Sequence, residues 1–492
     1  MSTADHEPVR RDEVMSTADR ETIRRDEAVS RKALPGASTT PCRPRPRELT
    51  DLIAEVRRSA FCVHPIRLSS GSPGVHGNRR GGQEIAVACR DRRPGVCPAC
   101  AHTYAGDAYQ VIATGLRGGK GVPASVASHP RAFVTLTAPS LGAVHSASRG
   151  PSDRLCHPRR ERPVCPHGRA ASCGERHSFN DPLVGEPLCP KCFDYPGAIL
   201  FNAQVSTLWN ATRIAAVRRL AHRATMTEKA LRSQVRLSFF KAVEVQRRGL
   251  IHLHVIVRAD GVVQSTKAGG NDDLGEETGK RDYPAPPEWV SSEMLVEALM
   301  AAAEAASIAV PGFAGREETR TGWGAQVDAH PFEAASTAEE VAAIARYTAK
   351  YCSKGSESSG VLARKVVSLI DLERAGVSPH VEKLVRTAWE MGTVPELAAL
   401  TLRDHAHTFG YRGYVSSKSR RYSTTLTALR EARARFQTGN GGGDGGGNGD
   451  GGASRPTGGG PSWRYAGRGY SHPDADRLAA RLAEVRRLRG KP

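Results

Sequence analysis

The sequence has no long apolar segment. A transmembrane helix needs about 18 or more apolar residues without charge, and the longest alanine-rich run, from Met294 to Val310, already contains Glu297 and Glu304. The N-terminus carries charge from its fifth residue and lacks the apolar core of a secretory signal. We therefore expect a cytoplasmic protein that does not bind a membrane and whose 11 cysteines are reduced.

Acidic residues are scarce relative to basic ones. Lysine and arginine total 70 against 51 aspartates and glutamates, which gives a formal charge of +19. A surplus of this size favours a polyanionic partner. Nucleic acid is the leading candidate. An anionic membrane surface is the alternative, and the lack of a long apolar segment argues against it.

A chain of 492 residues is longer than one hydrophobic core usually supports, so we expect about two to four structural units. Met1 and Met15 each begin one copy of a tandem repeat, so either could be the true start. The predicted parts are a disordered tail at 1–48, a cysteine-containing segment at 49–128, a main domain at 129–360 with a cysteine-rich insert at 150–195, a helical and basic segment at 361–437, a glycine-rich linker at 438–462 and a basic terminal helix within 463–492.

Two histidines lie two residues apart in an apolar run, His252-Leu-His254. Alternation along a strand puts both imidazoles on one face, while Ile251, Leu253 and Val255 point into a core. Taken alone, the pair is more typical of an ordinary strand than of a metal site.

Just upstream, Glu244 and Gln246 share a face in the same way. A tight connection over 248–250, which contains a glycine, predicts an antiparallel hairpin in which Gln246 lies opposite His252. The same register sets Glu244 opposite His254. Two imidazoles with a carboxylate or an amide suit a divalent ion that keeps open positions. A hairpin whose polar face meets solvent is the alternative.

A second pattern contains Tyr-x-x-Lys twice, at Tyr347/Lys350 and Tyr351/Lys354. On a helix these four side chains share one stripe. A phenol has a pKa near 10 and is a poor nucleophile, so adjacent lysines and a metal-bound phosphate would help it attack. The product would be a phosphotyrosine link to a DNA strand end. The alternative is a basic, solvated helix face whose tyrosines pack through their rings. The segment Ser336-Thr-Ala-Glu339 predicts the capping box that starts this helix.

Three motifs follow one another in the order Phe133-Val-Thr-Leu-Thr137, His252-Leu-His254 and Tyr347-x-x-Lys-Tyr-x-x-Lys354. In this order they resemble the motifs of HUH endonucleases that initiate rolling-circle replication, in the two-tyrosine version. Longer stretches resemble the replication initiator (RepSA-like) proteins of actinobacterial plasmids, over most of residues 50–437. These stretches are Thr135-Leu-Thr-Ala-Pro-Ser-Leu-Gly-Ala-Val-His145, Cys165-Pro-His-Gly168, Leu188-Cys-Pro-Lys-Cys192, Trp323-Gly-Ala-Gln-Val-Asp328 and Lys418-Ser-Arg-Arg-Tyr-Ser-Thr-Thr425.

The resemblance implies an α+β fold of the HUH endonuclease type. Its central antiparallel sheet would carry the histidines on a middle strand, with the tyrosine helix packed across it. The resemblance also implies that His252 and His254 hold Mg or Mn against the scissile phosphate. Tyr347 or Tyr351 would form a covalent 5′-phosphotyrosine and free a 3′-hydroxyl to prime synthesis, and the second tyrosine would serve strand rejoining.

Lys350 and Lys354 map onto the motif lysines, which implies that they stabilise the phenolate or the phosphate. The motifs do not fix a third metal ligand, and the hairpin geometry favours Glu244, with Gln246 second. The implied partner is plasmid origin DNA. No Gly-x-x-x-x-Gly-Lys-Ser/Thr motif occurs, so strand opening would depend on supercoiling or a host helicase.

Two other functions compete with this interpretation. A transposase or a conjugative relaxase would keep the chemistry, but relaxases generally place the tyrosine before the histidines, in contrast to this chain. A zinc-dependent DNA-binding regulator without nuclease activity would bind its site and never cut it.

The cysteines indicate structural zinc. Cys97/Cys100 and Cys189/Cys192 each form half of a tetrahedral site. Between these pairs lie further candidate ligands, with Cys62, His64 and Cys89 also available upstream. The ligands between the pairs are Cys156, Cys165, His167, Cys173 and His177. Zinc would replace the hydrophobic core that the insert lacks. The sequence does not show which ligands belong together, and Cys42 and Cys352 are predicted to be plain thiols.

A stretch at 405–425 interleaves tyrosines with basic residues. Such a pattern suits a DNA backbone and its unstacked bases, and a basic surface hairpin is the alternative. The residues that we predict to bind DNA are Lys418, Arg420, Arg421 and Tyr422, in a stretch that also holds Tyr411 and Tyr414.

Overall fold

The computed structural model describes residues 48–70, 84–147, 155–161, 163–263, 283–332, 337–353, 362, 364–439 and 463–489. Among the predictions above, the N-terminal tail up to residue 47, the linker from residue 440 to 462, Ser336 and Lys354 lie outside these ranges. The chain divides into the units Met1–Leu49 and Thr50–Pro492, and the elements below belong to the second unit apart from the first residue of α2. No helix in the described ranges is both long enough and apolar enough to cross a membrane.

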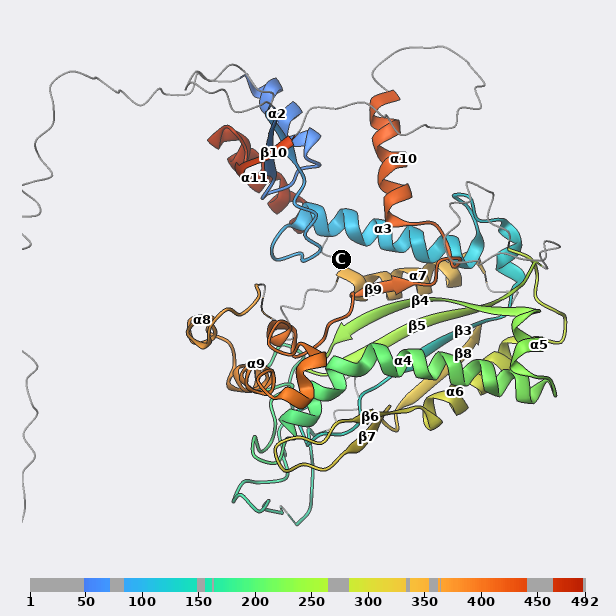
Figure 1. Cartoon of the computed structure of the whole chain (residues 1–492). Helices are drawn as coiled ribbons and strands as arrows, with labels where there is room; N and C mark the ends of the chain where they lie inside the picture. Colours follow the sequence, from blue (N-terminus) through green and yellow to red (C-terminus); the bar gives the residue numbers. More distant parts are fainter. Residues whose placement is uncertain are drawn as a thin grey trace, which may run out of the picture. The chain divides into compact units, whose positions relative to one another are not determined.

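A five-stranded antiparallel sheet forms the centre of the fold (Figure 1). Its strands, in spatial order, are β8 (Val327–Phe332), β3 (Arg131–Leu136), β5 (Ile251–Gly261), β4 (Val235–Val245) and β9 (Ser416–Lys418). The strand that carries His252 and His254 is therefore the middle one. This arrangement confirms the predicted α+β class and the predicted central antiparallel sheet.

The hairpin between β4 and β5 differs from its predicted register by two residues. Glu244 pairs with His252, and the backbone N–H of Gln246 donates to the carbonyl of Leu250 at 2.9 Å. The turn covers 247–249 and ends on Gly249, whose φ of +78° is left-handed. Such three-residue turns place glycine last, so the predicted connection over 248–250 was wrong. A shift by an even number keeps every side chain on its predicted face.

Helices cover both faces of the sheet (Figure 1). Leu253 and Val255 of β5 face α4 (Tyr195–Arg223), α6 (Ser292–Ala305) and α9 (Pro379–Met391) in the larger core. The opposite face, which includes His254, lies against α3 (Pro98–Arg117) and α7 (Ala338–Ser353). Each fully buried aliphatic side chain contributes about 1.5–3 kcal/mol, so the middle strand is held firmly from both sides.

Helix α7 begins at a capping box one residue later than predicted. The hydroxyl of Thr337 accepts from the backbone N–H of Glu340 at 3.2 Å, and the Glu340 carboxylate accepts from the backbone N–H of Thr337 at 2.8 Å. The carboxylate partner is therefore Glu340 and not Glu339. This reciprocal pair fixes the start of the helix and with it the rotation of its tyrosines.

The remaining elements lie around this sandwich. They are α2 (Leu49–Arg58), β1 (Ile66–Ser70), β2 (Glu84–Val87), α5 (Glu228–Arg232), β6 (Ser307–Val310), β7 (Thr319–Gly322), α8 (Leu369–Arg374), α10 (Leu426–Gly439), β10 (Trp463–Arg468), α11 (Pro473–Arg489) and three 3₁₀ turns, η1 (Ala124–Ser128), η3 (Pro395–Leu400) and η4 (Ala406–Thr408). Strand β10 pairs with β1 in a small sheet, and α11 packs on α2. The predicted basic terminal helix is thus packed against α2.

A buried ion pair ties β5 to β4 and α3. Arg258 donates from Nε to Asp260 Oδ1 at 2.6 Å and also donates to the carbonyl of Gly115, and both charged side chains are fully buried. Asp260 also accepts from Ser238 at 2.6 Å and contacts His129 Nδ1 at 2.9 Å. Burial raises the pKa of Asp260, but the hydrogen bonds with His129 and Arg258 together hold it below the ordinary value of 3.8.

We expect Asp260→Asn to destabilise the protein by about 3–5 kcal/mol, because the Arg258 charge is left buried without its partner. The free energy of unfolding should be measured by urea denaturation. The pKa of Asp260 is lower in the folded state, so its stabilisation is present above pH 4 and is lost as pH falls through the folded pKa. The difference in the free energy of unfolding between wild type and Asp260→Asn should therefore become smaller below about pH 4.

Asp474→Asn provides the matched control. Asp474 pairs with Arg477 at 3.0 Å, but its side chain is 48% exposed, and such a pair contributes less than about 1 kcal/mol. Equal losses in the two variants would contradict a structural role for the buried pair.

Candidate active site

The two tyrosines of α7 lie directly over the histidine strand. The ring of Tyr351 stacks on that of His254 with 4.0 Å between centroids, and the ring of Tyr347 meets His254 edge-on at 5.7 Å. The Tyr351 hydroxyl donates to the Tyr347 hydroxyl at 3.0 Å. The fold thus brings two motifs that are far apart in the sequence into one group of aromatic and imidazole rings.

Glu244, His252 and His254 form a group that could hold a metal ion, with one potential ligand atom from each lying within 4.8 Å of the others. His254 Nε2 lies 3.5 Å from Glu244 Oε2. This distance is long for a hydrogen bond. Two ligand atoms that each lie about 2.1 Å from a shared ion are about 3–3.5 Å apart, and the distance between His254 Nε2 and Glu244 Oε2 matches this separation.

The surroundings of the two imidazoles favour a role in metal binding over a role in packing alone. Thr137 Oγ1 lies 3.1 Å from His252 Nδ1, and a partner of this kind fixes the ring and leaves Nε2 for an ion. His254 is buried with its Nε2 beside the Glu244 carboxylate, whereas its Nδ1 finds no hydrogen-bond partner among the described residues.

The structure also shows the surroundings of the predicted catalytic Lys350, of Gln246, the second choice of metal ligand, and of the predicted plain thiol Cys352. Lys350 is exposed on α7, one turn after Tyr347. Gln246 accepts a hydrogen bond from Arg248 Nε at 2.9 Å within the turn region. Cys352 is buried beside Tyr351, and burial raises the pKa of its thiol to about 12.

Among the described residues, all cysteines except Cys352 lie, with three histidines, in three groups of four that could each hold a metal ion. These groups are Cys62, Cys89, Cys97 and Cys100; Cys165, His167, Cys189 and Cys192; and His145, Cys156, Cys173 and His177. The two Cys-x-x-Cys pairs therefore belong to different groups. His145 was missed as a ligand because it lies in a stretch of sequence that offers no other ligand nearby. His64, which the sequence left available, is not a member of any of these groups.

Within the described part of the insert, the ligand atoms lie close together. His167 Nδ1 is 3.2 Å from Cys192 Sγ, and His177 Nε2 is 3.4 Å from Cys173 Sγ. The other ring nitrogen of His177 lies 2.8 Å from Asp181 Oδ2. A carboxylate behind an imidazole is a common arrangement in zinc sites.

The predicted DNA-binding segment is exposed only in part. Arg420 and Arg421 are exposed after β9, and Lys418 donates to the carbonyls of Ser419 and Arg420. Tyr422 is completely buried, so its predicted contact with DNA bases is wrong. Its ring lies against Gly115 of α3, where any side chain would overlap it.

Comparison with known proteins decides the family. A family model described as "RepSA: Replication initiator protein, pSAM2" matches residues 48–484. The chain belongs to this family of replication initiators. A curated relative, the "Replication initiator protein" of Streptomyces ambofaciens, is 34% identical over 402 residues, which cover 78% of this chain and 79% of the relative. No solved structure matches the chain.

Proposed function

We propose that this replication initiator nicks one DNA strand at a plasmid origin and becomes covalently attached to the new 5′ end. The observation that carries the proposal is the placement of Tyr347 and Tyr351 over the Glu244, His252 and His254 group. A nucleophile beside a carboxylate and imidazole group is what metal-assisted phosphoryl transfer requires. Neither feature implies this chemistry alone.

Glu244, His252 and His254 would hold Mg or Mn, which when bound polarises the scissile phosphate and stabilises its developing charge. The oxygen of one tyrosine attacks phosphorus, its proton passing to solvent. The bond between phosphorus and the 3′-oxygen breaks, and that oxygen takes a proton from solvent. The products are a 5′-phosphotyrosine and a free 3′-hydroxyl that primes synthesis. No energy input is needed, because one phosphodiester replaces another.

Tyr347 is the better candidate for the first attack. Its side chain is 47% exposed, and its hydroxyl accepts a hydrogen bond from Tyr351. Tyr351 would act when the replicated circle is cut and rejoined. Lys350, and Lys354 outside the described residues, would stabilise the phenolate or the phosphate.

Binding of origin DNA follows from the family and the charge. The net charge of +19 favours a polyanion, and Lys418, Arg420 and Arg421 form a basic run at the edge of the sheet. Of the three tyrosines in this segment, Tyr414 has a side chain that is 83% exposed and would stack on an unpaired base. A host helicase is the proposed partner for strand opening, and the cytoplasm is the proposed location.

We also propose that the domain has the HUH fold and that zinc holds the insert together. The histidines on the middle strand and the tyrosine helix across them support the fold assignment. Two four-ligand groups in a segment with little apolar core support zinc. A transposase or relaxase function is less favoured, because the histidines precede the tyrosines and the family is one of replication initiators.

One experiment tests the function. Supercoiled plasmid that carries the candidate origin is incubated with the protein and Mn²⁺, and the products are separated with and without protease. We expect a nicked circle whose 5′ end carries protein until protease removes it. Specific binding without any nick would instead support the non-enzymatic DNA-binding regulator.

The orientation of His252 leads to a further prediction. We expect Thr137→Val to weaken Mn²⁺ binding by about 10- to 100-fold, because His252 loses the partner that fixes its ring. Electron paramagnetic resonance of free Mn²⁺ measures the affinity. Thr319→Val, at an exposed position of β7, is the control and should bind as wild type does. Equal Mn²⁺ affinities in both variants would show that Thr137 does not support metal binding by His252.

A further inference from the structure

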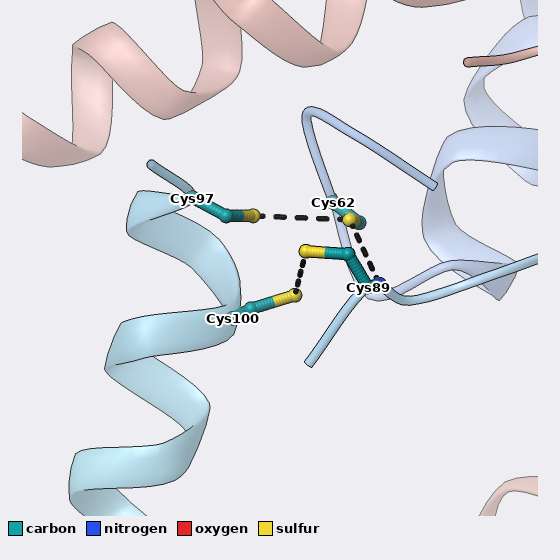
Figure 2. A group of neighbouring side chains, drawn as sticks. All are labelled: Cys62, Cys89, Cys97 and Cys100. Carbon is teal, nitrogen blue, oxygen red and sulfur yellow. Dashed lines mark hydrogen bonds between the residues drawn. The ribbon is translucent and has the colours of Figure 1, made fainter. Parts of the chain in front are cut away.

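Four cysteine sulfurs converge where the segments that follow α2 and β2 meet the beginning of α3 (Figure 2). Cys97 and Cys100 come from the beginning of α3, whereas Cys62 follows α2 and Cys89 follows β2. Cys62, Cys97 and Cys100 are buried, and Cys89 is half-buried.

The distances between these sulfurs match one tetrahedral ion. Cys97 Sγ lies 3.8 Å from Cys62 Sγ, and Cys89 Sγ lies 3.7 Å from Cys100 Sγ. Four sulfurs at about 2.3 Å from a zinc ion lie about 3.8 Å apart. Disulfide bonds would require about 2.05 Å. A cluster with several irons would spread the thiolates further, because irons and sulfides lie between them.

The backbone around the group is arranged to receive negative sulfur. The N–H of Cys89 points at Cys62 Sγ at 3.2 Å, and the N–H of Asp91 points at Cys89 Sγ at 3.5 Å. Cys97 is the N-cap of α3 and Cys100 lies in its first turn, where the helix dipole favours thiolates.

We propose that Cys62, Cys89, Cys97 and Cys100 bind one zinc ion, and that this ion holds together a module built from the first and last elements of the described residues. Four protein thiolates leave no open position, so the ion is structural. The proposal does not depend on the nicking chemistry.

The module contains α2, β1, β2, β10 and α11. Strand β10 pairs with β1 along its whole length, and the Tyr470 hydroxyl donates at 2.7 Å to the carbonyl of Cys62, one of the four ligands. The apolar core between α2 and α11 is small. Its buried members are Leu52, Val56, Tyr470, Ala475 and Ala479. So few buried side chains do not support a stable unit, and small units of this kind use metal instead.

Zinc content tests the site. The full chain, purified under reducing conditions, is analysed by plasma mass spectrometry as wild type, Cys62→Ser, Cys89→Ser and the control Cys352→Ala, whose buried thiol lies outside the four-ligand groups. We expect each of the first two variants to lose one zinc per chain and the control to lose none. Unchanged zinc in both serine variants, or iron in place of zinc, would overturn the proposal.

Hydrogen exchange tests the module. Zinc is released from the folded wild type with a mercurial reagent, which avoids any failure of the variants to fold. We expect exchange in residues 49–58 and 463–489 to rise at least tenfold when this zinc leaves, with β3 to β5 still protected. Unchanged protection of residues 463–489 from hydrogen exchange would overturn the claim that the ion joins β10 and α11 to α2, β1 and β2.

Cobalt identifies the ligands. Protein from cells grown with cobalt should show the visible bands of tetrahedral cobalt. The component from four thiolates lies at longer wavelength than the components from the two groups that contain histidine, and it should be absent in Cys62→Ser. A four-thiolate component that persists in this variant would assign the four-thiolate site to other residues.

Discussion

Replacing Tyr347 and Tyr351 together with phenylalanine will abolish nicking while origin binding persists. Each substitution removes one oxygen atom and keeps the ring, so the stacking of Tyr351 on His254 and the edge contact of Tyr347 should survive. Neither tyrosine oxygen then remains to attack the phosphate. Loss of a nucleophile typically costs catalysis at least about 10³-fold.

The single variants separate the roles of the two tyrosines. We expect Tyr347→Phe to lose most of the first cleavage of an origin oligonucleotide, because Tyr347 is the more exposed hydroxyl and the acceptor of the pair. Tyr351→Phe should cut but should fail to rejoin strands. Tyr465→Phe, on β10, is the control and should behave as wild type does. Full activity in the double variant would show that the nucleophile lies elsewhere.

Replacing His252 with alanine has the second large expected effect. The substitution removes one of the three proposed ligands, so transition-state stabilisation should fall by about 3 kcal/mol, or about 10²-fold in rate at limiting Mn²⁺. Added Mn²⁺ should restore part of the activity, because the lost ligand mainly lowers metal affinity. The measurement is the rate of oligonucleotide cleavage as a function of Mn²⁺ concentration.

His330→Ala is the matched control for this variant. His330 lies on β8 of the same sheet, but its side chain is 68% exposed and contacts Asp328. We expect its Mn²⁺ dependence to equal that of wild type. A His252→Ala variant with the same dependence would mean that the imidazole is not a ligand.

The sequence predicted which side chains share a face but not how strands and ligands are matched. Alternation with a period of two placed Glu244 on the histidine side, and this holds in any even register. The register itself depends on where the turn ends, and Gly249 closes the turn one residue before the predicted connection does. Local pattern therefore identified the residues of the candidate site and missed their pairing.

Tertiary packing explains the other differences. The four-ligand groups combine cysteines from separate loops, so Cys62 and Cys89 could be matched with Cys97 only once the fold was known. Tyr422 shares its basic and aromatic surroundings with surface residues. It is buried because Gly115 leaves room for its ring on α3, and spacing along the sequence does not reveal such a fit.

The most direct test of the central claim is the mass of the peptide that carries the DNA. After nicking, the covalent complex is digested with nuclease and trypsin, which cleaves after Arg346 and Lys350 and so places the two tyrosines on different peptides. We predict a nucleotide 5′-phosphate on the peptide that begins with Tyr347 or on the one that begins with Tyr351. An adduct on any other residue, or a nick with a free 5′-phosphate and no adduct, would contradict the tyrosine mechanism.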